Sequence, residues 1–188
     1  MAIDPSQFVV INVVDTCAVW NVLRSRSLYL AALSAGCHFV ITAYVHYECL
    51  IKPRKVIKPS DTELMSRLRS EQANSRFEAF SSDLSDLEKL LTSRKHLGRG
   101  EISSIAFAMK FSRAILTDDQ DARKLAANVG GLAVQTTPHL FSWLIYSEYL
   151  EDREKDTVII QHRQLDGILG KYLEEAYVLA VRYRAARS

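Results

Sequence analysis

Short hydrophobic runs alternate along this chain with longer stretches of helical periodicity. The runs are nearly continuous, which is typical of strands that are buried on both faces. The strand candidates are residues 9–14, 37–42, 114–117 and 132–135. The helix candidates are Ala18 to about Leu33, Ala43 to Ile51 with Thr42 as its cap, 98–110 and 121–126.

Strands that alternate with helices in this way favour a parallel sheet with right-handed crossovers. We therefore expect an α/β fold, with three α/β/α layers around a central, mostly parallel sheet. A chain of 188 residues can bury one substantial core. The pattern predicts one α/β domain over residues 1–150 and a C-terminal helical extension over residues 151–188.

Residues 60–95 have helical periodicity and are expected to form a helical insert in the α/β domain. Two capping-box patterns, Ser60 with Glu63 and Ser85 with Glu88, predict two helix starts there. Later in the chain, Thr137 followed by Pro138 predicts a helix that continues to about Leu150.

The last part of the chain begins with the charged segment 151–157, which predicts a turn or short linker. Residues 158–184 are expected to form one or two helices, interrupted at Gly167 and Gly170. Their apolar positions form a helical stripe that must pack on the core or on another chain: Val158, Ile159, Leu165, Ile168, Leu169, Leu173, Tyr177 and Val181. We expect this stripe to be an interaction element that is separate from the α/β core.

Acidic residues stand at strand ends and early in helices. Asp15 closes the first hydrophobic run, and Asp118 and Asp119 close the third. Glu48 lies in an otherwise apolar helix, and Glu101 lies in the first turn of another. Because parallel strands end at one edge of a sheet, these carboxylates are expected to converge. They repel one another, so a divalent cation is the simplest agent to hold them together.

Each acidic position also has an ordinary structural interpretation. Asp15 can cap a helix, and Glu101 is favoured in a first helical turn by the helix dipole. Asp118 and Asp119 can be turn residues. Glu48 is harder to explain in this way, because a Glu within an apolar helix is rarely buried without a partner.

The ordered set of motifs resembles the PIN-domain family of metal-dependent ribonucleases. The resemblance covers about residues 8–145. It rests on Val13-Val14-Asp15-Thr16, on Glu48, on Gly98-Arg99-Gly100-Glu101 and on Leu116-Thr117-Asp118-Asp119-Gln120-Asp121-Ala122-Arg123. The insert at 60–95 and the residues after 145 depart from compact members of that family.

The resemblance implies an endoribonuclease that hydrolyses RNA with Mg²⁺ or Mn²⁺. Its catalytic quartet would be Asp15, Glu48, Glu101 and Asp119, and its metal ligands would come from Asp15, Glu101, Asp118 and Asp119, with Asp118 and Asp119 competing for one place. In this interpretation Asp15 binds or bridges metal, and Glu48 binds a second ion or aligns the water. The hydroxyl of Thr16 or Thr117 would support the site.

Basic residues that could bind RNA phosphates flank the acidic positions. Lys52, Arg54, Lys55 and Lys58 follow the Glu48 helix, and Arg94, Lys95 and Arg99 precede Glu101; Arg123 and Lys124 could serve similarly. A solvated surface is the ordinary interpretation of each cluster. The formal net charge of +2 and the pI near 8.4 neither require nor exclude a nucleic acid.

The three cysteines, Cys17, Cys37 and Cys49, show no metal-binding or redox spacing, which favours a reducing compartment. No hydrophobic run reaches the roughly 18 residues that a membrane span needs. The sequence therefore predicts a cytoplasmic protein without a membrane contact.

Other functions share parts of the acidic pattern. A haloacid-dehalogenase-like phosphatase would carry a second Asp two positions after Asp15, where this chain has Cys17. A receiver-like, Mg²⁺-binding interaction module would carry a Lys at a later strand end, where Gln135 leads into Thr136. A catalytically silent PIN-like module is the third alternative. Among nucleases, the resemblance makes the toxin of a toxin–antitoxin pair plausible, with an antitoxin, another protein or a second copy as partner.

Overall fold

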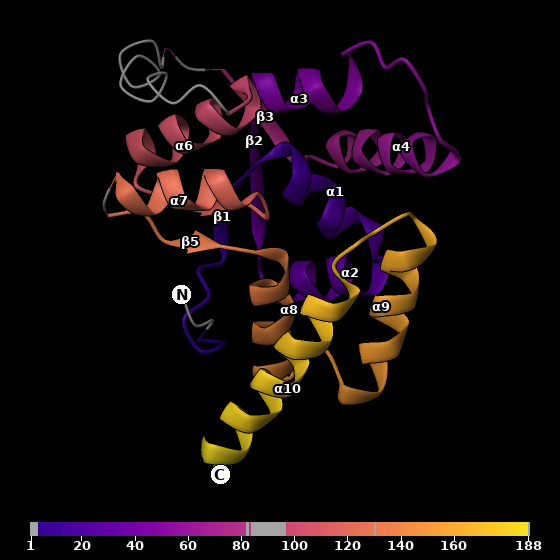
Figure 1. Cartoon of the computed structure of the whole chain (residues 1–188), viewed down its shortest axis with the longest axis vertical. Helices are drawn as coiled ribbons and strands as arrows, with labels where there is room; N and C mark the ends of the chain where they lie inside the picture. The colour runs from indigo at the N-terminus through magenta and orange to yellow at the C-terminus, as the bar shows by residue number, and fades with distance from the viewer. Residues whose placement is uncertain (1–3, 82, 84–96, 130, 188) are drawn as a thin grey trace.

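The computed structural model describes residues 4–81, 83, 97–129 and 131–187. These residues form a five-stranded, all-parallel sheet with helices on both faces, which confirms the expected α/β/α architecture (Figure 1). The strands are β1 (Ile11–Val14), β2 (His38–Thr42), β3 (Glu78–Phe80), β4 (Ala114–Leu116) and β5 (Val134–Gln135). Their order across the sheet is β3-β2-β1-β4-β5.

The two-residue period of the strands divides the core between the two faces of the sheet. In β1, Val13 points to a cluster with α6 (Arg99–Phe111) and α7 (Gln120–Asn128), whereas Val14 points to the opposite cluster. In β4, Ile115 and Leu116 divide in the same way. The opposite cluster includes α1 (Thr16–Arg24), α2 (Arg26–Ser34) and α8 (Thr137–Tyr146). Both central strands are therefore buried on two faces, as their apolar runs predict.

The order of strands in the sheet reverses at β1, which is therefore its topological switch point. After β1 the chain adds β2 and β3 on one side, and then crosses to add β4 and β5 on the other. The carboxyl ends of β1 and β4 are hydrogen-bonded neighbours, with Val14 paired to Leu116. In open α/β sheets, ligands bind in the crevice at such a switch point. Asp15 and Thr117 follow these two strand ends directly.

The expected single helix from Ala18 to Leu33 is in fact two helices, α1 and α2, which meet at Ser25. The Ser25 hydroxyl accepts a hydrogen bond from the Leu28 N–H at 3.2 Å. Gln161, from a distant helix, accepts hydrogen bonds from the Ser25 hydroxyl and the Ser27 N–H, each at 3.0 Å. The break therefore depends on a tertiary contact as well as on a local cap.

The expected helical insert contains one helix and one strand in its described part. Helix α4 (Pro59–Ala73) begins with Asp61 accepting a hydrogen bond from the Lys58 N–H at 3.1 Å, so the predicted cap formed by Ser60 and Glu63 is wrong. The predicted cap at Ser85 and Glu88 lies outside the described residues. Strand β3 was not predicted, because its three residues are exposed and show no apolar pattern. Pairing with β2 at the sheet edge defines it.

Helix boundaries in the C-terminal half also differ from the pattern. Helix α8 is capped by Thr136, and it ends at Tyr146 and not near Leu150. The charged segment forms a short 3₁₀ turn over Asp152–Glu154 and then enters α9 (Lys155–Gln164). Helix α10 (Gly170–Arg187) follows after a loop, so the extension consists of two helices.

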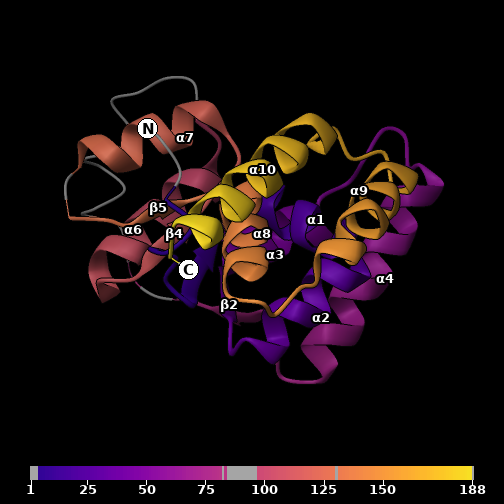
Figure 2. The same cartoon turned by 90° about the horizontal axis from the view of Figure 1, so that it is seen from below.

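Helices α9 and α10 share their core with the rest of the domain. Val158, Ile159, Leu169 and Leu173 are buried in the same cluster as the side chains of α1, α2 and α8. Figure 2 shows α10 beside α8, and α9 packs against α1 and α2. We expected the apolar stripe of residues 158–181 to form a separate interaction element. The structure differs from this expectation, because the stripe packs on the chain's own helices. Ile168 is the exception and is 87% exposed.

Among the described residues, no helix is both long and apolar enough to cross a membrane.

Candidate acidic site

Asp15 directly follows the carboxyl end of β1, which is paired with the end of β4. Its side chain is fully buried and caps α1 by accepting a hydrogen bond from the Ala18 N–H at 2.8 Å. The Thr117 hydroxyl donates to the other carboxylate oxygen, and the Cys17 thiol donates at 3.1 Å. Burial raises the pKa of the Asp15 carboxyl to about 7, although these three donors oppose the shift. Asp15 is therefore both a cap and a carboxyl group that titrates near neutral pH.

This pKa shift predicts that Asp15→Asn stabilises the fold more at pH 8 than at pH 4. The unfolded chain loses the Asp15 proton near pH 3.8 and the folded chain near pH 7, so the wild-type protein loses folding free energy as the pH rises through that window. The Asn side chain does not titrate. The free energy of unfolding of the variant, relative to the wild type, should therefore rise by a few kcal/mol up to pH 7 and then stay constant. Urea denaturation in EDTA at both pH values measures the difference. If the difference in stability between the two proteins does not change with pH, the raised pKa of Asp15 is contradicted.

Glu48 approaches α6 closely from α3 (Ala43–Leu50). The Thr16 hydroxyl donates a hydrogen bond to Glu48 Oε2 at 2.7 Å. A Cβ atom at Gly100 would lie 2.2 Å from the same oxygen, so only glycine leaves room for this carboxylate. The half-buried Glu48 thus links the start of α1, the helix α3 and the first turn of α6.

Glu101 lies in the first turn of α6 and accepts a hydrogen bond from the Gly98 N–H. Burial raises the pKa of the Glu101 carboxyl, and the negative charges of Asp119 and Glu48 raise it further. These like charges therefore act on Glu101 from two other parts of the chain. We call Glu48, Glu101 and Asp119 the acidic cluster, because the charges of Glu48 and Asp119 both act on Glu101.

Asp118 and Asp119 point into different surroundings. Asp118 accepts hydrogen bonds from the Thr137 N–H at 2.8 Å, the Thr137 hydroxyl at 2.6 Å and the Asn21 amide at 2.8 Å. Asp119 caps α7 through one oxygen, Oδ1, which accepts hydrogen bonds from Asp121 and Ala122. Within the described residues its Oδ2 accepts none. Asp118 is committed to joining β4, α1 and α8, whereas Asp119 keeps one oxygen available to the acidic cluster.

Thr117 connects the buried and the accessible parts of the site. Its hydroxyl donates to Asp15 and accepts a hydrogen bond from the Asp119 N–H at 3.2 Å. It therefore fixes the direction of the chain as it leaves β4. Thr16 and Thr117 both donate hydrogen bonds to acidic residues, Glu48 and Asp15 respectively.

The described residues contain no group of three or more His, Cys, Asp or Glu side chains close enough to hold a metal ion as they stand. The expected ligands Asp15, Glu101, Asp118 and Asp119 therefore do not form a finished coordination shell. Asp15 is enclosed by its donors and Asp118 is directed to Thr137, whereas the charges of Glu48 and Asp119 act on Glu101.

The basic residues expected to bind substrate lie in different surroundings. Arg54 is structural, because it forms an ion pair with Asp61 at 3.2 Å, donates to the Cys49 carbonyl and lies over the Trp20 ring. Lys58 approaches Asp166 at 3.8 Å.

Lys52 and Arg99, in contrast, line a cleft of about 690 Å³ that also includes Glu48. Lys55 is exposed outside this lining. Arg123 donates to the Asp119 carbonyl, Lys124 pairs with Asp121, and Arg94 and Lys95 lie outside the described residues.

Sequence inspection missed several residues that build the site. Asn21 and Thr137 hold Asp118, and Gly100 admits Glu48. A polar Asn in the apolar helix after Asp15 was a usable signal, because buried amides need partners. The two glycines that flank Arg99 were interpreted only as a helix start, although they also give the carboxylates of Glu48 and Glu101 room to approach.

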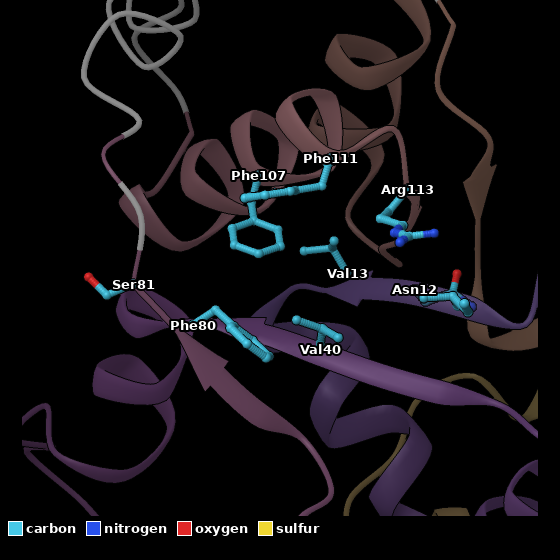
Figure 3. Close-up of a pocket in the computed structure, with 9 residues that line it drawn as sticks. Asn12, Val13, Val40, Phe80, Ser81, Phe107, Phe111 and Arg113 are labelled. Atoms are coloured by element: carbon cyan, nitrogen blue, oxygen red, sulfur yellow. The ribbon is translucent and has the colours of Figure 1, made fainter.

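A second hollow, of about 270 Å³, lies between α6 and the sheet (Figure 3). Phe80, Phe107, Phe111, Val13 and Val40 make its lining largely apolar, with Arg113 at one side. Its described lining contains no acidic residue, so it is not part of the acidic site.

The cysteines offer no alternative nucleophile in the described structure. Cys17, Cys37 and Cys49 are free, and burial raises the pKa of each thiol, to about 12 for Cys37. Thiols of this kind remain protonated at neutral pH and are poor nucleophiles. The chemistry of the crevice is therefore that of carboxylates and hydroxyls.

Comparisons with protein-family models, curated proteins and solved structures gave no significant match to this chain. The fold and the site thus define an α/β protein with acidic residues around the switch point of its sheet.

Proposed function

We propose that this protein is a metal-dependent ribonuclease that hydrolyses RNA phosphodiester bonds at the acidic crevice. The observation that carries the proposal is the close approach of Glu48 to Gly100 in the first turn of α6, where its charge and that of Asp119 act on Glu101. Like charges brought together beside a switch point favour the binding of a cation. The resemblance of the ordered motifs to PIN-domain ribonucleases supports the choice of RNA as substrate.

The donor chemistry of the cluster suits Mg²⁺ or Mn²⁺, which prefer carboxylate oxygens and water. Glu48, Glu101 and Asp119 would hold the ion. Among the described residues, Glu48 accepts one hydrogen bond from Thr16, and Glu101 accepts one from Gly98. Both are neutral donors, so these carboxylates can turn toward an ion without leaving a buried positive charge unpaired. Asp119 can use Oδ2 while Oδ1 still caps α7.

The bound ion would supply an activated water and would neutralise charge on the phosphate. The chain's own residues prepare the site for that chemistry. Thr16 orients Glu48, and Thr117 fixes the strand end that carries Asp119. Asp15 keeps the ends of β1 and β4 together through its hydrogen bond with Thr117, so its part is to position the other groups. Lys52 and Arg99 attract the RNA backbone to the adjoining cleft.

A cleavage assay tests the proposal. The purified protein is incubated with a panel of single-stranded and structured RNAs in Mg²⁺, in Mn²⁺ and in EDTA, beside the variant Glu101→Gln. The Gln side chain can still accept the hydrogen bond from Gly98 but loses the charge, so the variant should fold normally and cleave about 10² to 10³ times more slowly. Cleavage that survives both EDTA and Glu101→Gln would show contamination or a different mechanism. No cleavage of any RNA in either metal would contradict the proposal.

A further inference from the structure

The cleft beside the acidic cluster also has aromatic lining residues that the catalytic proposal does not use. Its walls come from α3, from Ser81 after β3, and from Gly98 and Arg99 at the start of α6. Glu48 belongs both to this cleft and to the acidic cluster, and the Gly98 N–H donates to Glu101. A ligand that fills the cleft therefore contacts Glu48 and lies next to the residue that binds Glu101.

Two tyrosines of α3 line this cleft with much of their surface exposed. Tyr44 and Tyr47 are three residues apart, so they lie on neighbouring positions of one helical face. They are 41% and 45% exposed, and packing in the core does not account for them. Exposed aromatic rings in a groove are the usual platforms on which unpaired bases stack.

Two cations complete the lining. Among the described residues, neither Lys52 nor Arg99 forms an ion pair, whereas Arg54 and Lys58 in the same region do. Positive charges that lack a carboxylate partner are available for phosphate groups. The cleft thus combines aromatic surfaces with positive charge, and Glu48 of the acidic cluster is part of its lining. This combination fits a polyanion whose bases are accessible.

We infer that Tyr44 and Tyr47 form a stacking platform for the bases of single-stranded RNA, with Lys52 and Arg99 contacting the phosphates beside those bases. The inference rests on the proposed ribonuclease function and specifies its substrate as an unpaired strand. A duplex hides the faces of its bases within the helical stack, so it cannot use the platform. The strand would run through the cleft so that the next phosphodiester lies near Glu48 and Glu101.

Binding measured without metal separates this inference from catalysis. Fluorescence anisotropy in EDTA is used to titrate the protein into a labelled single-stranded oligoribonucleotide, with duplex RNA of equal length as the comparison. Tyr44→Ala and Tyr47→Ala should each weaken binding to the single strand about 5- to 100-fold. Tyr44→Phe and Tyr47→Phe keep the ring and should bind like the wild type. Lys52→Ala and Arg99→Ala should each reduce the slope of log K against log salt by about 0.7.

Tyr183→Ala is the matched control, because Tyr183 is 40% exposed but lies on α10, at the opposite end of the molecule from α3 (Figure 1). It should leave binding unchanged, and circular dichroism checks the fold of every variant. Wild-type affinity in both Tyr→Ala variants, or equal affinity for duplex and single strand, would overturn the platform. A failure of cleavage with intact, tyrosine-dependent binding would instead overturn only the catalytic proposal.

Discussion

Asp119→Asn is expected to reduce Mg²⁺-dependent RNA cleavage about 10²- to 10³-fold while the protein remains folded. The substitution removes the negative charge that couples Asp119 to Glu101. It keeps an oxygen that can cap α7, and Asn is as good an N-cap as Asp. Initial rates of cleavage at saturating metal, together with a urea denaturation curve, measure both parts of the expectation.

Asp118→Asn is the matched control, and we expect it to lower the stability of the protein while leaving the cleavage rate largely unchanged. Asp118 accepts three hydrogen bonds, from the Thr137 N–H, the Thr137 hydroxyl and the Asn21 amide. An Asn there places an N–H₂ group against at least one of these donors, so we expect a loss of about 1 to 3 kcal/mol in the free energy of unfolding. The cleavage rate of the folded fraction should stay within a few-fold of the wild type. A larger catalytic loss from Asp118→Asn than from Asp119→Asn would show that the acidic cluster has been assigned to the wrong residue.

Removal of the chain after Glu151 is expected to abolish cooperative folding. The deletion exposes the face of α8 that α10 covers, and it removes Val158, Ile159, Leu169 and Leu173 from the core. It also removes Gln161, which accepts hydrogen bonds at the junction of α1 and α2. Loss of the sharp thermal transition, followed by differential scanning calorimetry, is the expected result. A truncated protein that unfolds cooperatively would show that α9 and α10 are a separable element after all.

A pair of point variants tests the same packing without a deletion. Leu173→Ala should cost about 2 to 5 kcal/mol of stability, because Leu173 is fully buried and its truncation leaves a cavity. Ile168→Ala should cost almost nothing, because Ile168 is 87% exposed. Urea denaturation of the two variants compares them directly. Similar losses in both would contradict the core assignment of α10.

The central strands were predictable because burial leaves a direct mark on their sequence. Residues of β1 and β4 face two hydrophobic clusters, so β4 is continuously apolar and β1 is apolar except for Asn12. Strand β3 leaves no such mark, because Glu78–Phe80 is short, exposed and defined only by its pairing with β2. The break at Ser25 was hidden for a related reason, since Gln161 contributes to it from 136 residues away. Contacts between residues so far apart in the sequence leave no local pattern.

The acidic cluster was predictable in outline and not in detail. Parallel strands that end at one edge explain why Asp15 and the Asp118-Asp119 pair lie near one another. The sequence left the choice between Asp118 and Asp119 open, because that choice depends on where each side chain turns. Thr137, which is 19 residues away, holds Asp118 and leaves Asp119 to face Glu101. The expected antitoxin or second copy of the chain stays a prediction.

The most direct test of the account is a calorimetric titration of the purified wild-type protein with Mn²⁺, repeated with Glu101→Gln and Asp119→Asn. Glu48, Glu101 and Asp119 are proposed to hold the ion, so the wild type should bind Mn²⁺ saturably and each variant should bind it at least about ten times more weakly, since each loses one charged ligand. Asp118→Asn should bind like the wild type. Absence of saturable binding to the folded wild type, or equal affinity in all four proteins, would contradict a metal site in this crevice.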